Sequence, residues 1–479
     1  MSTLTALARA IAVERQVAQR STTVRHVYLS AHPLVIIPLA LAGEANAPLA
    51  VLIGEDRGMS RLLTVPEPRD RTQRFAFVAE VAAIILDYLE HSADPQLLIP
   101  SNAGVQFMKL LGRSTRLRRT TGEWAVPDQV PVLGRWLTFF TERAEYPGSC
   151  LLLAMTDVLA QHWATGQSPV EDQNLAALLG WIDPPPGLTG PQAAALAENP
   201  VATPPAGPAT DPTFDNEVLA DHINHIRTAR FTGDGRAYDR AKTALDADLA
   251  AQLVPTWARM WRAIDLLRQL PEGGHVAQRW AEDKLQFARY ADHVRDGGPP
   301  QPRRDSAIAA ARRLSWLEHV QEQLAGQRAF DDPLVMAEYR LTGQAFAGEV
   351  IAAEPDRLDA SGKKRTLRPR ITVATSDDLR TIDTGAELTS PARPKQKALV
   401  IDVTPFGLIT LELSGGMGRK LTAEPGTVPA VGERICFAGF SDSFQTPPRF
   451  PAPEDTPWTH GGPPAPYVPS EDDASEAWS

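Results

Sequence analysis

The glycine-rich stretch "LSGGMGRK", Leu413–Lys420, has the composition of a loop that could hold a phosphate. A nucleotide-binding P-loop needs a lysine and a hydroxyl directly after its last glycine, and a helix that begins there. In this stretch Gly418 is followed by Arg419, Lys420 and Leu421, so the hydroxyl is missing. The flanking residues favour strands on both sides. We therefore predict a turn whose glycines supply positive φ values.

Two histidines, His222 and His225, stand three residues apart in "DNEVLADHINH", with Glu217 and Asp221 close in sequence. Paired histidines on a helix can bind zinc. No matching ligand motif occurs elsewhere in the sequence, so we expect a solvated helix face and predict no metal and no cofactor. His162, on an apolar segment, is expected to be a core residue.

Catalytic motifs are not found in the sequence. There is no GxSxG elbow, and nothing near Cys150 indicates an activated thiol. The carboxylates fit no nuclease or glycosidase pattern. We predict a non-catalytic protein. One alternative stays open, an enzyme whose site lies in the N-terminal block and uses His26, His32 and several carboxylates.

Positive charge is concentrated in two later segments. The stretch "SGKKRTLRPR" leads into a predicted strand. Arg419 and Lys420, from a different turn, are expected to join it if the barrel closes suitably. The candidate nucleic-acid-binding residues are Lys363, Lys364, Arg365, Arg368, Arg370, Arg419 and Lys420. Barrels of the OB type bind single strands with basic loops and stacking aromatics. Phe346, Phe406 and Phe437 are all expected in the core, so aromatics for stacking are sparse.

A second basic cluster lies in the first block, in "GRSTRLRRTTG". Its members are Arg113, Arg116, Arg118 and Arg119. Two separate clusters in an acidic chain favour a local contact with nucleic acid, although a basic loop also suits an acidic protein partner.

The overall composition limits the classes of protein. The chain has 479 residues, a net charge of −10 and two cysteines. This length predicts more than one domain, and the net charge provides no global field for nucleic acid or anionic membrane. Isolated cysteines fit a reducing cytoplasm. The polar N-terminus does not resemble a signal peptide, and the apolar run from Pro33 is too short to span a membrane. We expect a cytoplasmic protein with no membrane contact.

The pattern of elements predicts a multidomain α+β protein. Short apolar runs and amphipathic segments over 1–183 indicate mixed α/β structure followed by helices, with strands at 24–30, 34–41, 48–54, 61–65 and 96–101 and helices over 74–91, 150–166 and 168–182. Proline-rich residues 184–213 are expected to be a linker. The helical segments over residues 214–343 predict a helical bundle, with separate helices before and after Pro255.

Residues 344–445 switch to short strands rich in β-branched residues and separated by glycine and proline. This pattern predicts a small β-barrel of the OB or SH3-like kind. Residues 446–479 are rich in proline and then acidic, and they are expected to be a disordered tail.

The segments "GEVIAAEPDRLD", "RPRITVATSDDL" and "VPAVGERICFAGF" resemble, in strand and turn pattern, the small β-barrel inserted in superfamily 1 helicases. The resemblance covers about a fifth of the chain, and the ATPase motifs of that family are absent. It implies an accessory role beside nucleic acid or its enzymes, without motor activity.

The sequence thus predicts an adaptor or accessory subunit of a nucleic-acid-processing assembly. It would contact nucleic acid through the basic loop of the barrel. The competing hypothesis is a protein-interaction scaffold that does not bind nucleic acid and whose basic loop and acidic tail engage protein partners.

Overall fold

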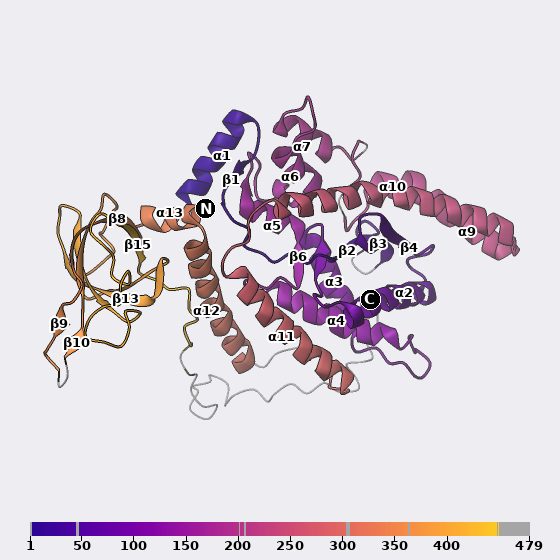
Figure 1. Ribbon diagram of the computed structural model, residues 1–479. Coiled ribbons are helices and arrows are strands. Elements are labelled where there is room, and N and C mark those ends of the chain that lie inside the picture. Colours follow the sequence, from indigo (N-terminus) through magenta and orange to yellow (C-terminus); the bar gives the residue numbers. More distant parts are fainter. Residues whose placement is uncertain are drawn as a thin grey trace.

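The structure is a computed structural model of the chain, and it describes residues 2–44, 47–200, 202–205, 207–302, 307–362, 365–447 and 449. A β-barrel formed by the later part of the chain lies to one side of a larger body (Figure 1). The body holds a sheet covered by helices. Among the described residues, no helix combines the length and apolar character that crossing a membrane would require.

The body is built on a five-stranded sheet of order β4-β3-β2-β5-β6. β2 pairs antiparallel with β3 and parallel with β5, while β5 pairs parallel with β6. The strands are β2 Leu34–Ala40, β3 Pro48–Asp56, β4 Met59–Thr64, β5 Leu97–Ile99 and β6 Leu152–Ala154. All seven residues of β2 are buried, as expected for a central strand covered on both faces.

Pro38 lies within β2, although proline cannot donate to a strand ladder. β5 pairs only with Leu34 and Val35, at the start of the strand. On that side the ladder has ended before Pro38. Further along, the Ala40 amide donates to the Pro208 carbonyl at 2.5 Å, so the proline-rich segment continues the pairing of β2.

Helices around the sheet mostly follow the sequence prediction. They are α1 Thr3–Arg15, α2 Arg71–His91, α3 Asn102–Thr115, α4 Gln129–Ala144, α5 Met155–His162, α6 Leu175–Ile182 and α7 Gly190–Glu198. Two short strands, β1 Gln19–Arg20 and β7 Trp163–Ala164, pair antiparallel with each other.

Three local predictions for this region differ from the structure. The expected helix over 150–166 begins as strand β6, because Leu152–Ala154 extend the parallel sheet beside β5. Ser168 and Glu171 do exchange capping hydrogen bonds, but the turn there is a short 3₁₀ helix, and α6 starts after Asn174. The proline-rich segment 184–213 contains α7, whose Thr189 and Gln192 form a capping box.

Residues 212–341 are mainly helical. They form α8 Pro212–Phe214, a π-helical turn Asp215–Leu219, α9 Ala220–Thr232, α10 Gly235–Arg268, α11 Val276–Arg295, α12 Ala307–Asp331 and α13 Pro333–Leu341. Pro255 lies inside α10 and does not end it, so the prediction of two helices was wrong at this point. Leu253, Thr256 and Trp257 are buried beside Pro255, and this packing holds the helix together across a residue that lacks its amide hydrogen.

These helices share their core with the sheet. One hydrophobic cluster joins β-strand residues such as Ile37 and Leu98 to Leu249 and Trp261 of α10 and Trp280 of α11. Four tryptophans, Trp257, Trp261, Trp280 and Trp316, are predicted from the sequence to fill a helical core. The first three are buried in this cluster, whereas Trp316 of α12 is 45% exposed, so its assignment to the core was wrong. The helical segment therefore has no separate core of its own among the described residues.

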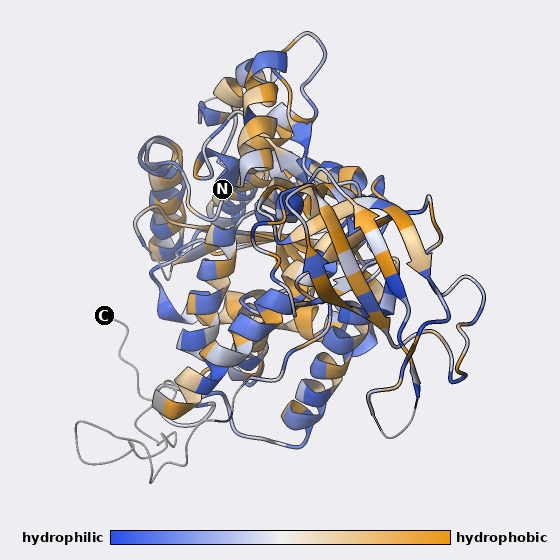
Figure 2. Cartoon of the chain, turned by 90° about the vertical axis from the view of Figure 1, so that its left-hand side faces the viewer, coloured by the Kyte–Doolittle hydropathy of each residue, from blue (hydrophilic) through white to orange (hydrophobic). Residues whose placement is uncertain are grey.

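The later part of the chain forms a closed barrel of order β11-β14-β13-β12-β15-β8, as the sequence predicted. Its strands are β8 Ala345–Glu354, β11 Arg370–Ala374, β12 Glu387–Ser390, β13 Arg393–Val403, β14 Leu408–Ser414 and β15 Arg434–Ala438. In β14 each second residue is buried, as the period-two pattern requires. Figure 2, in which the barrel faces the viewer, shows this alternation of hydrophobic and hydrophilic residues along its strands. A short hairpin extends from the barrel. Its strands, β9 Leu358–Asp359 and β10 Thr366–Leu367, have two residues each.

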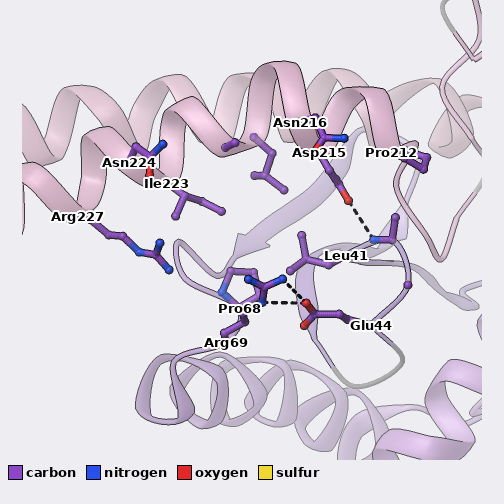
Figure 3. A pocket seen from close by; sticks show the side chains of 14 residues that line it. Leu41, Glu44, Pro68, Arg69, Pro212, Asp215, Asn216, Ile223, Asn224 and Arg227 are labelled. Atoms are coloured by element: carbon purple, nitrogen blue, oxygen red, sulfur yellow. Dashed lines mark hydrogen bonds and ion pairs between the residues drawn. The ribbon is translucent and has the colours of Figure 1, made fainter.

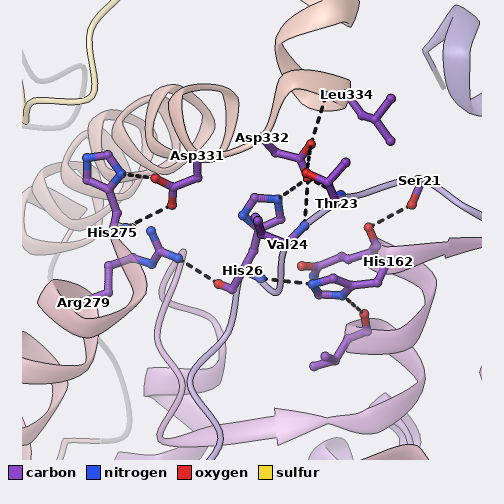
Figure 4. A network of polar contacts seen from close by, with 12 residues as sticks. Ser21, Thr23, Val24, His26, His162, His275, Arg279, Asp331, Asp332 and Leu334 are labelled. Atoms are coloured by element: carbon purple, nitrogen blue, oxygen red, sulfur yellow. Dashed lines mark hydrogen bonds and ion pairs between the residues drawn. The ribbon is translucent and has the colours of Figure 1, made fainter. Parts of the chain in front are cut away.

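Residues 22–31 cross the middle of the body without forming the predicted strand. Arg25 forms an isolated bridge with Glu272, and most of the other backbone groups bond to side chains from distant elements. The His26 amide donates to His162 Nε2 at 3.1 Å, and its carbonyl accepts from Arg279 at 2.8 Å. The Thr23 amide donates to Asp332 at 2.7 Å (Figure 4). We call residues 22–31 the threaded segment.

The barrel is joined to the body at both of its chain ends. α13 leads directly into β8, and after β15 the chain returns along α12. A Cβ on Gly326 of α12 would lie 2.2 Å from the Ser441 carbonyl oxygen, so only glycine permits this approach. The ring of Phe440 packs on Tyr339 and that of Phe444 on Trp316, with centroids 4.4 and 4.6 Å apart.

His275 adds a titratable contact to this junction. Its Nδ1 lies 2.6 Å from Asp331 of α12, and its Nε2 lies 3.1 Å from Asp442 in the segment after the barrel. Hydrogen bonding to Asp331 is the main cause that raises the pKa of His275 above its ordinary value. Both nitrogens can donate only when the imidazole is protonated.

Replacing His275 with glutamine should therefore destabilise the protein in a pH-dependent way. The folded-state pKa is raised, so the stabilisation is complete below the unfolded value of about 6.5 and fades as the pH rises through the folded value. We expect the difference in melting temperature between wild type and His275→Gln to be largest near pH 5.5 and to shrink above neutrality.

His91 provides a control, because it forms a similar pair with Asp87 but is exposed on the surface. The His91→Gln variant should track the wild type over the same pH range. A difference for His275→Gln that grows with rising pH would contradict this account of the junction.

Candidate nucleic-acid interface

The two chain segments that carry the described basic residues lie side by side at one end of the barrel. β11 begins at Arg370, which pairs with Glu412 near the end of β14. The Leu413 amide donates to the Pro369 carbonyl at 2.8 Å. The segment before β11 and the turn after Ser414 therefore start side by side. The chain enters the barrel from α13 at the start of β8, while Arg370 pairs with Glu354 at the end of β8, so this end of the barrel is distal to that connection (Figure 1). We call it the distal end.

Within the distal end, two arginines already have a carboxylate partner. Arg357 and Arg370 both contact Glu412, at 2.7 and 3.3 Å. Arg357 also donates to the Arg368 carbonyl at 3.0 Å and so fixes the backbone of the basic loop. Arg370 thus contributes to the structure of the barrel, and its charge is largely matched.

The remaining cations have no carboxylate partner within the described part of the chain. Arg365, Arg419 and Lys420 are exposed, and Arg368 is half-buried. Lys395, which the sequence analysis did not single out, joins them because its carbonyl lies against Gly415 and Gly416. Only the pairing of β13 with β14 brings it there, and no local sequence signal marks it. Lys363 and Lys364 lie outside the described residues.

Carboxylates also lie at the distal end. Asp356 accepts a hydrogen bond from the Ala423 amide at 3.4 Å, and Glu424 lies against Gly418. Asp359 is engaged with Ser361. This mixture weakens any broad positive field, so the cations can act only over short distances.

The glycine-rich stretch turns the chain after β14, as predicted, but the strand expected directly after it is absent, because the next strand, β15, begins only at Arg434. Gly415, Gly416 and Gly418 have φ values of 75°, 66° and 91°, which suit glycine. Between them the side chain of Met417 is 3% exposed and belongs to the core of the barrel. The Met417 carbonyl accepts from the Glu424 amide at 3.1 Å. The turn thus closes the barrel with Met417 and presents Arg419 and Lys420 outward.

The aromatic residues of the barrel do not lie at the distal end. Phe346 and Phe437 are core residues, as predicted. Phe406 is 90% exposed, so its assignment to the core was wrong. It lies in the turn between β13 and β14, beside the end of β11 at Ala374, and hence at the opposite end from Arg370. A turn residue between two strands needs no buried partner, which explains its exposure.

The second basic cluster does not form one surface. Arg116 is buried, and its guanidinium donates to the carbonyls of Gln301 and Pro302 at 2.9 and 3.0 Å. The guanidinium of Arg118 lies 5.9 Å from the centre of the Phe75 ring. Arg113 and Arg119 are exposed. Part of this cluster therefore supports the fold, and it belongs to the body.

The histidines provide no metal site in the described part of the chain, which holds no group of three or more metal-ligating side chains. His222 lies 2.6 Å from Asp248, and His225 is exposed. His162 is fully buried, and its burial lowers its pKa to about 4. This neutral ring accepts from the His26 amide, so it is a structural core residue.

Several cavities occur in the body. One of about 550 Å³ lies between the β2–β3 loop and α9 and is lined in part by Leu41 and Ile223 (Figure 3). Its charged side chains have partners, such as Arg69 with Glu44. His32 lines a different cavity from His26. The two histidines thus do not converge on one site, which removes the arrangement that the enzyme alternative required.

Comparisons with known proteins add no relative. No family model, curated protein or solved structure matches the chain. The likeness to the helicase barrel therefore extends only to the presence of a small closed barrel.

Met417 should be a principal stabilising residue of the barrel. Its truncation to alanine leaves a cavity at the distal end and should cost about 2–4 kcal/mol of unfolding free energy. Hydrogen exchange of the β13 and β14 amides would measure this loss locally. Met59, which is 74% exposed, provides the control: Met59→Ala should leave exchange unchanged. Equal protection in both variants would show that Met417 does not close the barrel.

Proposed function

We propose that the protein is a non-catalytic accessory subunit that contacts the phosphate backbone of nucleic acid through the distal end of its barrel. The proposal is supported by the contact between Pro369, which follows Arg368, and Leu413 at the end of β14, after which the chain runs on to Arg419 and Lys420. Arg365, Arg368, Arg419 and Lys420 form no ion pair with a carboxylate among the described residues, and in this proposal they supply cations to one surface.

The chemistry of this surface favours phosphates over bases. Lysine and arginine pair with phosphate oxygens regardless of sequence. Base stacking needs exposed aromatic rings, and the described aromatic residues of the barrel lie elsewhere. We therefore expect binding without sequence preference and with a strong dependence on salt.

The acidic character of the whole chain restricts how binding occurs. A protein with a net charge of −10 is repelled by nucleic acid at long range. The distal end projects away from the body, which lets the barrel approach a backbone while the acidic body stays farther off. This geometry supports an accessory role, in which a second protein supplies part of the binding energy.

Fluorescence anisotropy with single-stranded and duplex oligonucleotides across a salt series tests the proposal. We expect binding at low salt that weakens steeply as salt rises. Replacing Arg365, Arg368, Arg419 and Lys420 with glutamine should make the slope of log affinity against log salt shallower by about one for each phosphate contact removed. Arg370 is kept because it pairs with Glu412.

A control variant with the same charge change carries glutamine at four exposed arginines of the body, namely Arg236, Arg240, Arg289 and Arg312. It should keep the wild-type slope. If the full-length protein does not bind at low salt, or if both variants behave alike, the distal end is not a nucleic-acid interface. The scaffold hypothesis would then be favoured.

A further inference from the structure

An open groove runs between helix α2 and the β3–β4 hairpin of the sheet. Its larger part, of about 800 Å³, lies between β4 and the second half of α2. A second hollow, of about 580 Å³, continues it toward the turn between α9 and α10. Glu80 of α2 lines both hollows, so they form one continuous surface along this helix. We call this surface the α2 groove.

The wall that α2 contributes has a regular spacing. Ala76, Glu80, Ala83 and Asp87 all line the groove and are all exposed. The two alanines are seven residues apart, and so are the two carboxylates. A seven-residue spacing keeps two packed helices in contact along their length. Alanine side chains are short, so the axis of a second helix can come close to α2 here.

The opposite wall of the groove is apolar. Met59 of β4 is 74% exposed, and Leu63 lies on the same face of the strand and is half-buried. Ile84 of α2 is also half-buried and lines the groove beside them. Covering these side chains would remove apolar surface from water, which stabilises a complex. The groove therefore suits an occupant that brings apolar side chains.

The rim of the larger part is acidic. Its ionisable residues are four carboxylates, one arginine and one histidine, namely Glu55, Asp56, Glu80, Asp87, Arg61 and His32. Within the described residues, Glu55 and Glu80 form no ion pair, and Asp87 pairs only with the exposed His91. Arg61 can offset one of the four negative charges. The groove thus has an excess of negative charge that favours a cationic occupant.

The cations of the smaller part do not supply this missing charge. Arg230 pairs with Glu67, and Lys242 pairs with Asp246. The acidic residues 471–476 of the chain itself have the same sign of charge as the groove, so they are unsuitable occupants. A metal ion is also a poor fit, because the described residues hold no group of three or more metal-ligating side chains. These observations favour a segment of another protein.

We propose that the α2 groove binds a basic amphipathic helix of a partner protein. The helix would lie along α2, with lysine or arginine side chains at seven-residue spacing facing Glu80 and Asp87. Its apolar side chains would cover Met59 and Leu63. At 1.5 Å per residue, the stretch from Ala76 to Asp87 spans about 16 Å, or about three turns. Docking of an amphipathic helix in an apolar groove is a common mode of recognition. This inference does not depend on nucleic-acid binding.

Fluorescence anisotropy of the full-length protein with labelled peptides tests the proposal. The probe is a peptide of about 18 residues, built from leucine and lysine in an amphipathic helical pattern, which is long enough to form a helix. A second peptide of the same composition alternates leucine and lysine as a strand does, and a third has glutamate in place of each lysine. We expect the first peptide to bind at least about tenfold more tightly than either of the others, because only it matches both the spacing and the charge of the groove.

Two variants locate the binding site on the protein. Exchanging Glu80 for glutamine together with Asp87 for asparagine should weaken binding of the first peptide by roughly three- to tenfold, because two exposed ion pairs are lost. Ala83→Gln should weaken it without changing the charge, because the longer side chain fills the groove. All three positions are exposed, so these variants should fold.

Matched controls carry the same types of change at exposed positions on other helices. Glu14→Gln combined with Glu198→Gln removes two exposed carboxylates of α1 and α7, and Ala195→Gln enlarges an exposed alanine of α7. Both controls should bind the first peptide like the wild type. The glutamine variant of the distal end should also bind it normally, which separates this test from that of nucleic-acid binding.

Three results would overturn the proposal. The first is that the lysine peptide with the helical pattern does not bind. The second is that the alternating peptide or the glutamate peptide binds as tightly, and for the alternating peptide this result would indicate strand pairing with the edge of β4 instead. The third is that the groove variants bind like their controls, which would place the peptide elsewhere on the acidic surface.

Discussion

The threaded segment, residues 22–31, is the constraint on which the rest of the structure depends. A buried backbone must find partners for its amides and carbonyls, and this segment finds them in side chains instead of in a neighbouring strand. Gln96 bonds to the Ser30 amide and the Tyr28 carbonyl, and Arg268 bonds to the carbonyls of Ser30 and Ala31. Together with His162, Arg279 and Asp332, these contacts tie five separate regions of the chain to one strip of backbone. The sheet and the helices therefore form a single body.

The barrel contrasts with this body in how it satisfies its backbone. A closed barrel pairs its strands with each other and leaves no open edge, so it needs few partners outside itself. Its connection to the body consists of α13, the close approach at Gly326, the aromatic pairs on α12 and α13, and His275. This arrangement leaves the distal end free of the body and its side chains available to solvent.

The sequence predicted those features that depend on local pattern. Period-two alternation indicated the barrel strands, and long apolar runs indicated β2 and β3. The sequence did not predict the local structure of segments whose partners lie far away in the chain. The stretch "VRHVYLS" has the composition of a strand, yet most of its partners are side chains at least 66 residues away in the sequence. The stretch beginning at Cys150 has helical composition, but β5 recruits its first residues into the sheet. The proline-rich segment could not be seen to hold α7, because α6 supplies the packing surface.

Some residues of the candidate surface could likewise be found from the sequence, and others could not. The basic residues of the distal end were found because they cluster in sequence, and the two turns were expected to meet if the barrel closed. Lys395 was missed, since its position depends on the register of β13 with β14.

The hydrogen bond between Thr23 and Asp332 spans 309 residues. During synthesis at roughly 5–20 residues per second, about 15–60 s separate the appearance of the two partners. For that interval Thr23 lacks its carboxylate partner, although the helices α2 to α11, which include those that pack on the sheet, are made earlier. We therefore expect the threaded segment to take its final position only after the end of α12 has emerged.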